Sequence, residues 1–224
     1  MLVSPTERFE KAWQICSSLW FPINEAHLLS TIAELDHSLS RENKDLIIAK
    51  IKEDPALFCH CIREASYHFH NSKKKGPRPQ HPSKLLATLE LSHIEQILKN
   101  ARSHLSPHSF TQMTRLQAEQ LHELLVTAST VETLSHAVNI DPETGYTTAL
   151  VRQLGYTLIA WNYPRIFERA MKRVATGEER SRVFYELLGF SPYLLGITTA
   201  TEWQLGLEIK ASLGDNEAIN KIKS

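Results

Sequence analysis

The stretch FTQMTRLQAEQLHELLVTASTVETLSHAV, residues 110–138, decides the class of fold. Apolar side chains recur in it at the spacing of one face of an α-helix. The pattern predicts one long helix over about 110–138, with an apolar stripe along its length. The stripe consists of Leu116, Leu121, Leu124, Leu125, Ala128, Val131, Leu134 and Val138.

Helix signals recur on both sides of this segment. Ser4-Pro5-Thr6-Glu7 combines an N-cap, a proline at the first helical position and a capping-box glutamate, and Ser92 with Glu95 repeats the capping spacing. No strand alternation and no internal repeat is found, so the chain is predicted to be all-α. The other helices are expected at about 5–20, 23–36, 43–53, 55–70, 85–89, 92–103, 145–160, 164–177, 178–188 and 192–205, with a short one at the C-terminus.

The composition excludes several classes of protein. The 25 basic and 25 acidic residues cancel, so no overall field draws the chain to nucleic acid or to an anionic membrane. The N-terminus lacks the features of a secretory signal, and no segment approaches the roughly 20 apolar residues that cross a bilayer. Three cysteines, an odd number, indicate reduced thiols. We therefore expect a cytoplasmic protein that does not insert into a membrane.

Eleven histidines make a metal site the first chemical hypothesis. The densest cluster is Cys59-His60-Cys61, followed by His68 and His70, and thiolates and imidazoles are the usual zinc ligands. On a helix, Cys59 and Cys61 point about 200° apart and cannot grip one ion together. Cys61 and His68 could share a face, but two ligands fall short of a structural zinc site. A buried thiol pair flanked by exposed histidines is therefore favoured, and no cofactor is expected.

Other catalytic and binding motifs are weak. Neither a nucleophile elbow nor a nucleotide-binding glycine motif occurs in the sequence. The basic run Lys73, Lys74, Lys75 and Arg78 lies in the proline-containing segment NSKKKGPRPQHP at 71–82. No aromatic residues are interleaved with it, so a solvated loop is favoured over a nucleic-acid contact.

Five segments carry a family resemblance. They are Trp20-Phe21-Pro22, IAKIKEDPALFCHCIREAS at 48–66, LELSHIEQILKNA at 89–101, TALVRQLGYTLIAWNYP at 148–164 and ELLGFSPYLLGITTATEW at 186–203. In this order they resemble the HDOD domain, a degenerate relative of the HD metal-dependent phosphohydrolases found in bacterial signalling proteins. Ala65-Ser66 stands where the family favours Asn-Ser.

The resemblance covers about residues 20–206 and implies a helical bundle of two subdomains. We expect a subdomain at 21–110 and a degenerate HD-like subdomain at 111–206. A helical extension at 1–20 and a tail helix at 207–224 would flank them.

The resemblance also implies where metal ligands would stand in a catalytic relative. Such enzymes hold a metal-activated water with a histidine on the long helix, a His-Asp pair on the next helix and further ligands beyond it. The pair falls at Arg152-Gln153, the first histidine at or near Leu124, and a later one near Pro192 or Tyr193. A guanidinium and a neutral amide cannot replace the pair, so the chain is predicted to be a non-enzyme with a vacant metal site.

The vacated positions define a candidate cleft for a small anionic ligand or a nucleotide. Its residues are Arg152, Gln153, His122 and Tyr193, with Arg152 as the anion-binding group; Arg152 pairing with a glutamate or lying exposed is the structural alternative. The family implies a regulatory module that acts in signal transduction through a protein partner. Two alternatives stay open: a phosphohydrolase with relocated ligands such as His122, His136 and glutamates, and a weak nucleic-acid binder that uses the Lys73 to Arg78 loop.

Overall fold

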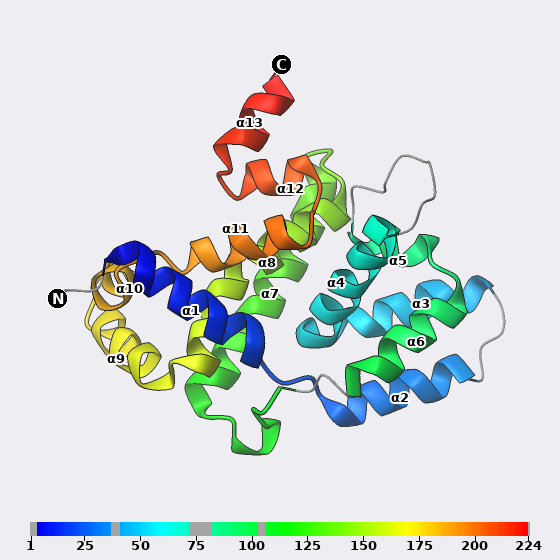
Figure 1. The fold of residues 1–224 in the computed structure, drawn as a ribbon, viewed down its shortest axis with the longest axis horizontal. Coiled ribbons are helices and arrows are strands. Elements are labelled where there is room, and N and C mark those ends of the chain that lie inside the picture. The colour runs from blue at the N-terminus through cyan, green and yellow to red at the C-terminus, as the bar shows by residue number, and fades with distance from the viewer. Residues whose placement is uncertain (1–3, 37–40, 72–81, 103–105, 224) are drawn as a thin grey trace.

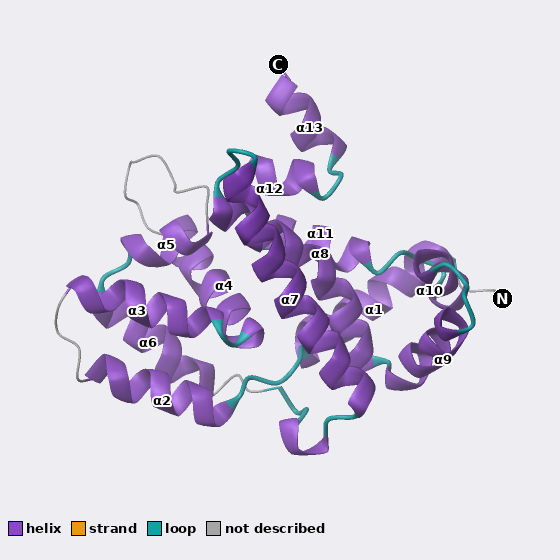
Figure 2. Ribbon diagram, turned by 180° about the vertical axis from the view of Figure 1, so that it is seen from behind, coloured by secondary structure: helices purple, strands orange, loops and turns teal. Residues whose placement is uncertain are grey.

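The computed structural model describes residues 4–36, 41–71, 82–102 and 106–223 of the chain. Over these ranges the molecule contains thirteen α-helices and a short 3-10 helix, and no strand is found in them (Figure 2). The all-α prediction is confirmed. The helices form two groups: α2 to α6 lie together on one side of the molecule, and α1 lies with α7 to α11 on the other (Figure 1).

The first group is built around α4 (Pro55–Asn71), whose first two turns are buried throughout. Around it lie α2 (Glu25–Asp36), α3 (Arg41–Lys52), α5 (Pro82–Thr88) and α6 (Leu91–Ala101). Asp54 begins α4, because its Oδ1 accepts the backbone N–H groups of Ala56 at 2.8 Å and Leu57 at 3.1 Å. Its Oδ2 accepts the N–H of Asn24 at 2.6 Å, so one carboxylate ties the start of α4 to the segment before α2.

The second group is built on an antiparallel pair, α7 (Arg115–Ala137) and α8 (Pro142–Asn162). Gln117 near the start of α7 donates a hydrogen bond to the carbonyl of Ala160 near the end of α8, at 3.1 Å. Most of α8 is buried because helices cover it on several sides. The remaining helices are α1 (Pro5–Leu19), α9 (Pro164–Ala175), α10 (Arg180–Leu188), α11 (Tyr193–Glu202), α12 (Leu207–Ser212) and α13 (Asn216–Lys223).

Two glycines bring α8 and α11 into direct backbone contact. A Cβ atom added to Gly155 would lie 1.8 Å from the carbonyl oxygen of Pro192, and one added to Gly196 would lie 2.2 Å from that of Val151. Real Cβ atoms do not approach so closely, so only glycine fits at either position. The two helices therefore leave no space between them at this level.

Several predicted boundaries need correction. The segment 110–138 is not one helix: a 3-10 turn (Phe110–Gln112) precedes α7, and a capping box of Thr114 and Gln117 starts α7 at Arg115. The predicted Ser92/Glu95 capping box is wrong, because α6 starts at Leu91 after Glu90, with Leu91 packed on the core. The C-terminal segment forms two short helices instead of one.

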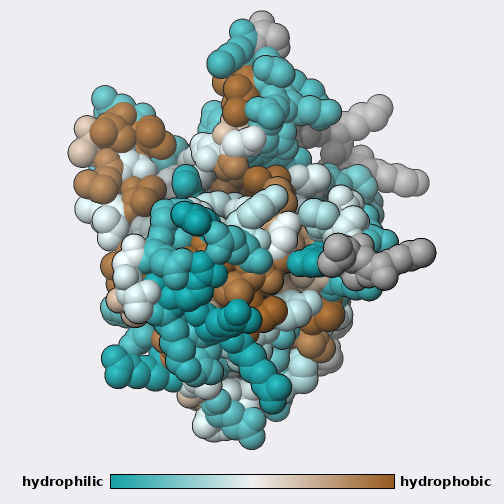
Figure 3. Space-filling model, turned by 90° about the vertical axis from the view of Figure 1, so that its left-hand side faces the viewer, coloured by the Kyte–Doolittle hydropathy of each residue, from teal (hydrophilic) through white to brown (hydrophobic). Residues whose placement is uncertain are grey.

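The side of the molecule that carries α9 and α10 is mostly hydrophilic (Figure 3). Arg173 there donates hydrogen bonds to Glu178 and Glu186, and Arg182 donates one to Glu186 at 2.9 Å. None of the described helices is both long enough and apolar enough to span a bilayer.

Candidate functional site

Arg152 and Tyr193, two of the predicted cleft residues, lie together. Arg152 is exposed on α8, and its guanidinium carbon stands 5.0 Å from the centre of the Tyr193 ring on α11. This distance is that of a cation–π contact. Arg152 therefore stacks on an aromatic ring at the position where the resemblance places a metal-ligating pair.

The contact continues inward as an arginine–tyrosine stack, formed by Arg152, Tyr193, Tyr156 and Arg180. The Tyr193 ring meets the Tyr156 ring edge-on, with centroids 5.3 Å apart, and the Arg180 guanidinium lies 4.5 Å from the centre of the Tyr156 ring. Burial, followed by the neighbouring Tyr193, raises the pKa of the Tyr156 hydroxyl, so it stays neutral at ordinary pH.

Arg180 connects this stack to α7. Its two terminal nitrogens donate hydrogen bonds of 2.6 Å each, one to Glu123 and one to the buried side chain of Gln120. A planar guanidinium suits such a forked contact, and its partial burial strengthens each hydrogen bond. The stack thereby holds α7, α8, α10 and α11 together.

Leu124 and Gln153, the other inward-facing positions, offer no open site. Leu124 is fully buried in the core. Gln153 is half-buried, and its side-chain oxygen is enclosed without a hydrogen bond from the described residues. Beside them, the backbone of α11 at Pro192 packs directly on Gly155. The positions expected for metal ligands are filled by a packed helix contact.

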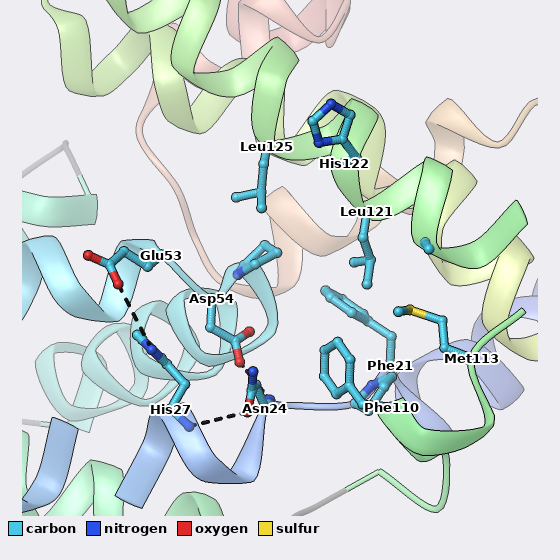
Figure 4. Close-up of a pocket in the computed structure, with 13 residues that line it drawn as sticks. Phe21, Asn24, His27, Glu53, Asp54, Phe110, Met113, Leu121, His122 and Leu125 are labelled. Atoms are coloured by element: carbon cyan, nitrogen blue, oxygen red, sulfur yellow. Dashed lines mark hydrogen bonds and ion pairs between the residues drawn. The ribbon is translucent and has the colours of Figure 1, made fainter. Parts of the chain in front are cut away.

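His122 does not join Arg152, Gln153 and Tyr193. Gln117 on α7 bonds α8, and at about 100° per residue His122, five positions later, lies about 140° around the helix from it. His122 lines a separate cavity of about 390 Å³ between α7 and the first group of helices (Figure 4), which we call the linker groove. The structure therefore divides the predicted cleft residues between two places.

The linker groove has apolar walls and a polar end. Its walls are formed by Phe21, Pro22, Pro55, Phe110, Met113, Ala118, Leu121 and Leu125, and its polar residues are Asn24, His27, Glu53, Asp54 and His122. Few polar groups placed in an apolar cavity are typical of binding sites.

Two groups at the polar end are held by neighbours. The Nε2 atom of His27 lies 2.7 Å from the carbonyl oxygen of Lys50, and its Nδ1 lies 3.9 Å from Glu53. Burial raises the pKa of Asp54, and the three backbone N–H groups that bind its carboxylate oppose this change. The side chain of Glu53 is 70% exposed and is the accessible negative group of the groove.

The cluster Cys59-His60-Cys61 is buried. Cys59 and Cys61 are both fully buried on α4, as predicted for a thiol pair, and His60 between them is also buried, which was not predicted. Burial raises the pKa of both thiols, which disfavours the thiolate that a metal needs. No group of three histidine, cysteine or acidic side chains in the described ranges could hold a metal ion.

His122 and His136, two ligands of the relocated-ligand alternative, lie too far apart to share one metal ion. His122 and His136 lie on the same helix, and the rise of 1.5 Å per residue separates them by about 21 Å. Two imidazoles so far apart cannot coordinate one ion, because ligand nitrogens lie about 2 Å from a metal. The other alternative rests on Lys73, Lys74, Lys75 and Arg78, which lie outside the described residues.

A further cavity, of about 270 Å³, was not predicted from the sequence. It lies where the end of α1, the segment 20–23, α4 and Trp203 at the end of α11 meet. We call it the tryptophan pocket. The apolar neighbours of Trp13, Trp161 and Trp203 predict core positions, which is correct for Trp161 and Trp203, while Trp13 is half-buried and packs against the core. Trp20 is half-buried at the pocket.

Comparison with known proteins shows a shared fold. No protein-family model matches the sequence, and no curated protein matches it. The structure is similar to that of the response regulator MmoQ from Methylococcus capsulatus str. Bath, with a TM-score of 0.64 and 17% identity over 93% of this chain and 83% of that chain. A candidate phosphohydrolase from Shewanella amazonensis SB2B matches with a TM-score of 0.43 and 14% identity, over 93% and 71% of the two chains.

Proposed function

We propose that this chain is a non-catalytic regulatory module of the HDOD type, which acts in signal transduction by binding a protein partner in the linker groove. The observation that carries the proposal is the packed arginine–tyrosine stack at the positions where the resemblance places metal ligands. The fold shared with a response regulator and the HDOD-like sequence segments support it.

The groove indicates what kind of partner segment it would bind. Leu121 projects from α7 toward Phe21, and Leu125 lines the groove nearer Asp54, so the walls suit an apolar side chain (Figure 4). Glu53 at the polar end would attract a basic group next to that side chain. A partner segment with a large apolar residue beside a lysine or arginine satisfies both ends.

Metal analysis tests the non-catalytic part. The full chain, purified without chelators, is expected to contain less than stoichiometric zinc, iron and manganese by elemental mass spectrometry. The double variant Arg152→His/Gln153→Asp restores the expected ligand pair and serves as a matched comparison. Stoichiometric metal in the unmodified chain, removed by chelators together with phosphohydrolase activity, would refute the proposal.

Cross-linking in the native cell tests the groove. Leu125→Glu places a charge on the groove wall and is expected to abolish the cross-linked partner, because an apolar partner side chain would then face a carboxylate. Val126→Glu is the matched control, since Val126 is 49% exposed on the same helix and does not line the groove. Equal loss in both variants, or no loss in Leu125→Glu, would show that the partner binds elsewhere.

A further inference from the structure

We propose that the tryptophan pocket binds a small aromatic anion, a planar ring that carries one carboxylate or phosphate group. This site is separate from the linker groove, so the proposal goes beyond the function proposed above. The pocket is lined by aromatic, hydroxyl and cationic side chains, chiefly Trp20, Phe21, Trp203, His60, Arg63 and Ser106.

One cationic side chain, Arg63, lines the pocket, and it is paired with Glu64 outside the lining. Arg63 is the only formally charged side chain among the described residues that line it, and no aspartate or glutamate is one of them. The guanidinium donates one hydrogen bond to Nδ1 of His60 at 3.0 Å and another to Glu64 at 3.0 Å. These contacts fix its plane and use two of its five N–H groups. A planar fork held in this way is suited to an anionic oxygen.

The wall beside this cation is aromatic. The Trp20 ring stacks on Phe21 with centroids 5.4 Å apart, and it lies 5.7 Å from the Trp203 ring. Indole faces and edges attract other planar rings, in addition to the gain from burying apolar surface. The pocket therefore presents one cationic group next to a surface suited to a flat ring.

The backbone at the pocket adopts conformations that side chains rarely accept. Trp20 has φ 55° and ψ −147°, in a region used almost only by glycine, and Gln204, next to Trp203, has φ 51°. Trp20 is held there because its N–H donates to the carbonyl of Cys16 and its own carbonyl accepts from Asn162, each at 3.0 Å.

Glycine would relieve this strain, so the bulky indole at position 20 has to contribute something that glycine cannot. Strained residues of this kind cluster at ligand-binding sites, where the surrounding structure holds them in place. Here the residue in the strained conformation, Trp20, lines the pocket. This backbone observation is independent of the charge and points to the same cavity.

The size of the pocket limits the ligand. At about 270 Å³ it lies just below the usual range of roughly 300–1,000 Å³ for small-molecule sites. One bicyclic ring with an acidic group fits such a volume, whereas a dinucleotide does not.

Calorimetric titration of the full chain tests the proposal with three probes: 2-naphthoate, adenosine 5′-monophosphate and the neutral 2-naphthamide. At least one of the two anions is expected to bind saturably at millimolar concentration, and naphthamide roughly tenfold more weakly than naphthoate if the carboxylate is the group recognised. Binding of naphthoate alone identifies a carboxylate ligand, and binding of the nucleotide alone identifies a phosphate ligand.

Arg63→Gln is expected to weaken anion binding roughly tenfold or more. Arg165→Gln, which removes an exposed arginine on α9 that does not line the pocket, is expected to leave it unchanged. The proposal is wrong if neither anion binds. It is also wrong if naphthoate binds and naphthamide binds as tightly, or if a folded Arg63→Gln variant keeps the anion affinity of the original chain. The comparison of naphthoate with its amide needs no variant and therefore still decides the case for a carboxylate if Arg63→Gln does not fold.

The Leu125→Glu variant separates the two proposals. It alters the linker groove and not the tryptophan pocket. Anion binding that survives in it, together with loss of the protein partner, supports both sites, and each can fail without the other.

Discussion

Two regions of the molecule combine aromatic rings with arginines: the contact between α8 and α11, and the surroundings of the segment 20–24. They differ in how closely the backbones approach each other. At Gly155 the two helices touch, and the arginine–tyrosine stack fills the surface beside them. At 20–24 the chain is irregular, and cavities of about 390 and 270 Å³ lie against it. Regular helices that meet through glycine exclude ligands, whereas an irregular segment between helices leaves room for them.

The largest expected loss of stability comes from disrupting the backbone contact between α8 and α11. Gly155→Ala places a methyl group where the carbonyl of Pro192 stands, and a backbone atom cannot move aside as a flexible side chain can. We expect a loss of about 3 kcal/mol or more in the free energy of unfolding, measured by urea denaturation.

Gly177→Ala is the control for this variant. Nothing lies within 4 Å of the added methyl group, and the cost comes only from the positive φ of 95°. It should lose roughly 1–2 kcal/mol. Similar losses for both variants would mean that α8 and α11 are not in backbone contact.

An intermediate loss of stability is expected at Asp54, whose carboxylate binds the backbone of the segment 20–24 at Asn24. In the original chain Oδ2 of Asp54 accepts the backbone N–H of Asn24 at 2.6 Å. In Asp54→Asn an amide NH₂ would face that N–H, so two donors would meet and no hydrogen bond could form. The loss should be about 2 kcal/mol at neutral pH, from a buried donor left unsatisfied. Urea denaturation followed across the pH range measures it.

The same variant has a distinctive pH dependence. Burial raises the pKa of Asp54 above its unfolded value of about 3.9, so the folded protein holds this proton to higher pH than the unfolded chain does. The stabilisation of the folded protein that comes from holding this proton is fully present below about pH 3.9. It is lost as the pH rises through the raised pKa. It should therefore be absent from Asp54→Asn, and an unchanged slope of stability against pH would contradict the assignment.

The smallest effect is expected at Arg152, the outer end of the stack. Arg152→Ala removes an exposed cation–π contact and should cost about 0.5 kcal/mol. Thermal denaturation should show Arg152→Lys as nearly stable as the original chain, because a lysine can also lie over the ring. A loss well beyond that value would mean that Arg152 has a structural role that its exposure does not indicate.

Local signals in the sequence predicted most of the helices. Ser4 with Glu7 and Asp54 before Pro55 start helices as predicted, since a cap involves residues only two or three positions apart. The helix predicted from about 145 starts earlier, at Pro142, with Asp141 as its N-cap. The long segment 110–138 was predicted as one helix, although its apolar stripe begins only at Leu116 and the residues before it form a 3-10 turn at Phe110–Gln112.

The sites were harder to predict, because they depend on residues distant in the chain. Arg180 meets Gln120 sixty positions away, and no local pattern predicts that pair. His122 was grouped with Arg152 by resemblance, although helical geometry points it to another cavity. The positive φ of Trp20 gave no signal either, because glycine or asparagine normally marks such a turn.

Phe21 lines both the linker groove and the tryptophan pocket, and its side chain is fully buried between them. A single ring that forms a wall of two cavities couples their occupancies only if a ligand in one of them moves the ring. If an anion in one cavity shifts the ring, the affinity of the other cavity changes by some factor, and thermodynamic reciprocity requires a partner bound in the groove to change anion affinity by the same factor. One phenylalanine would then make a small metabolite an allosteric effector of a protein–protein contact.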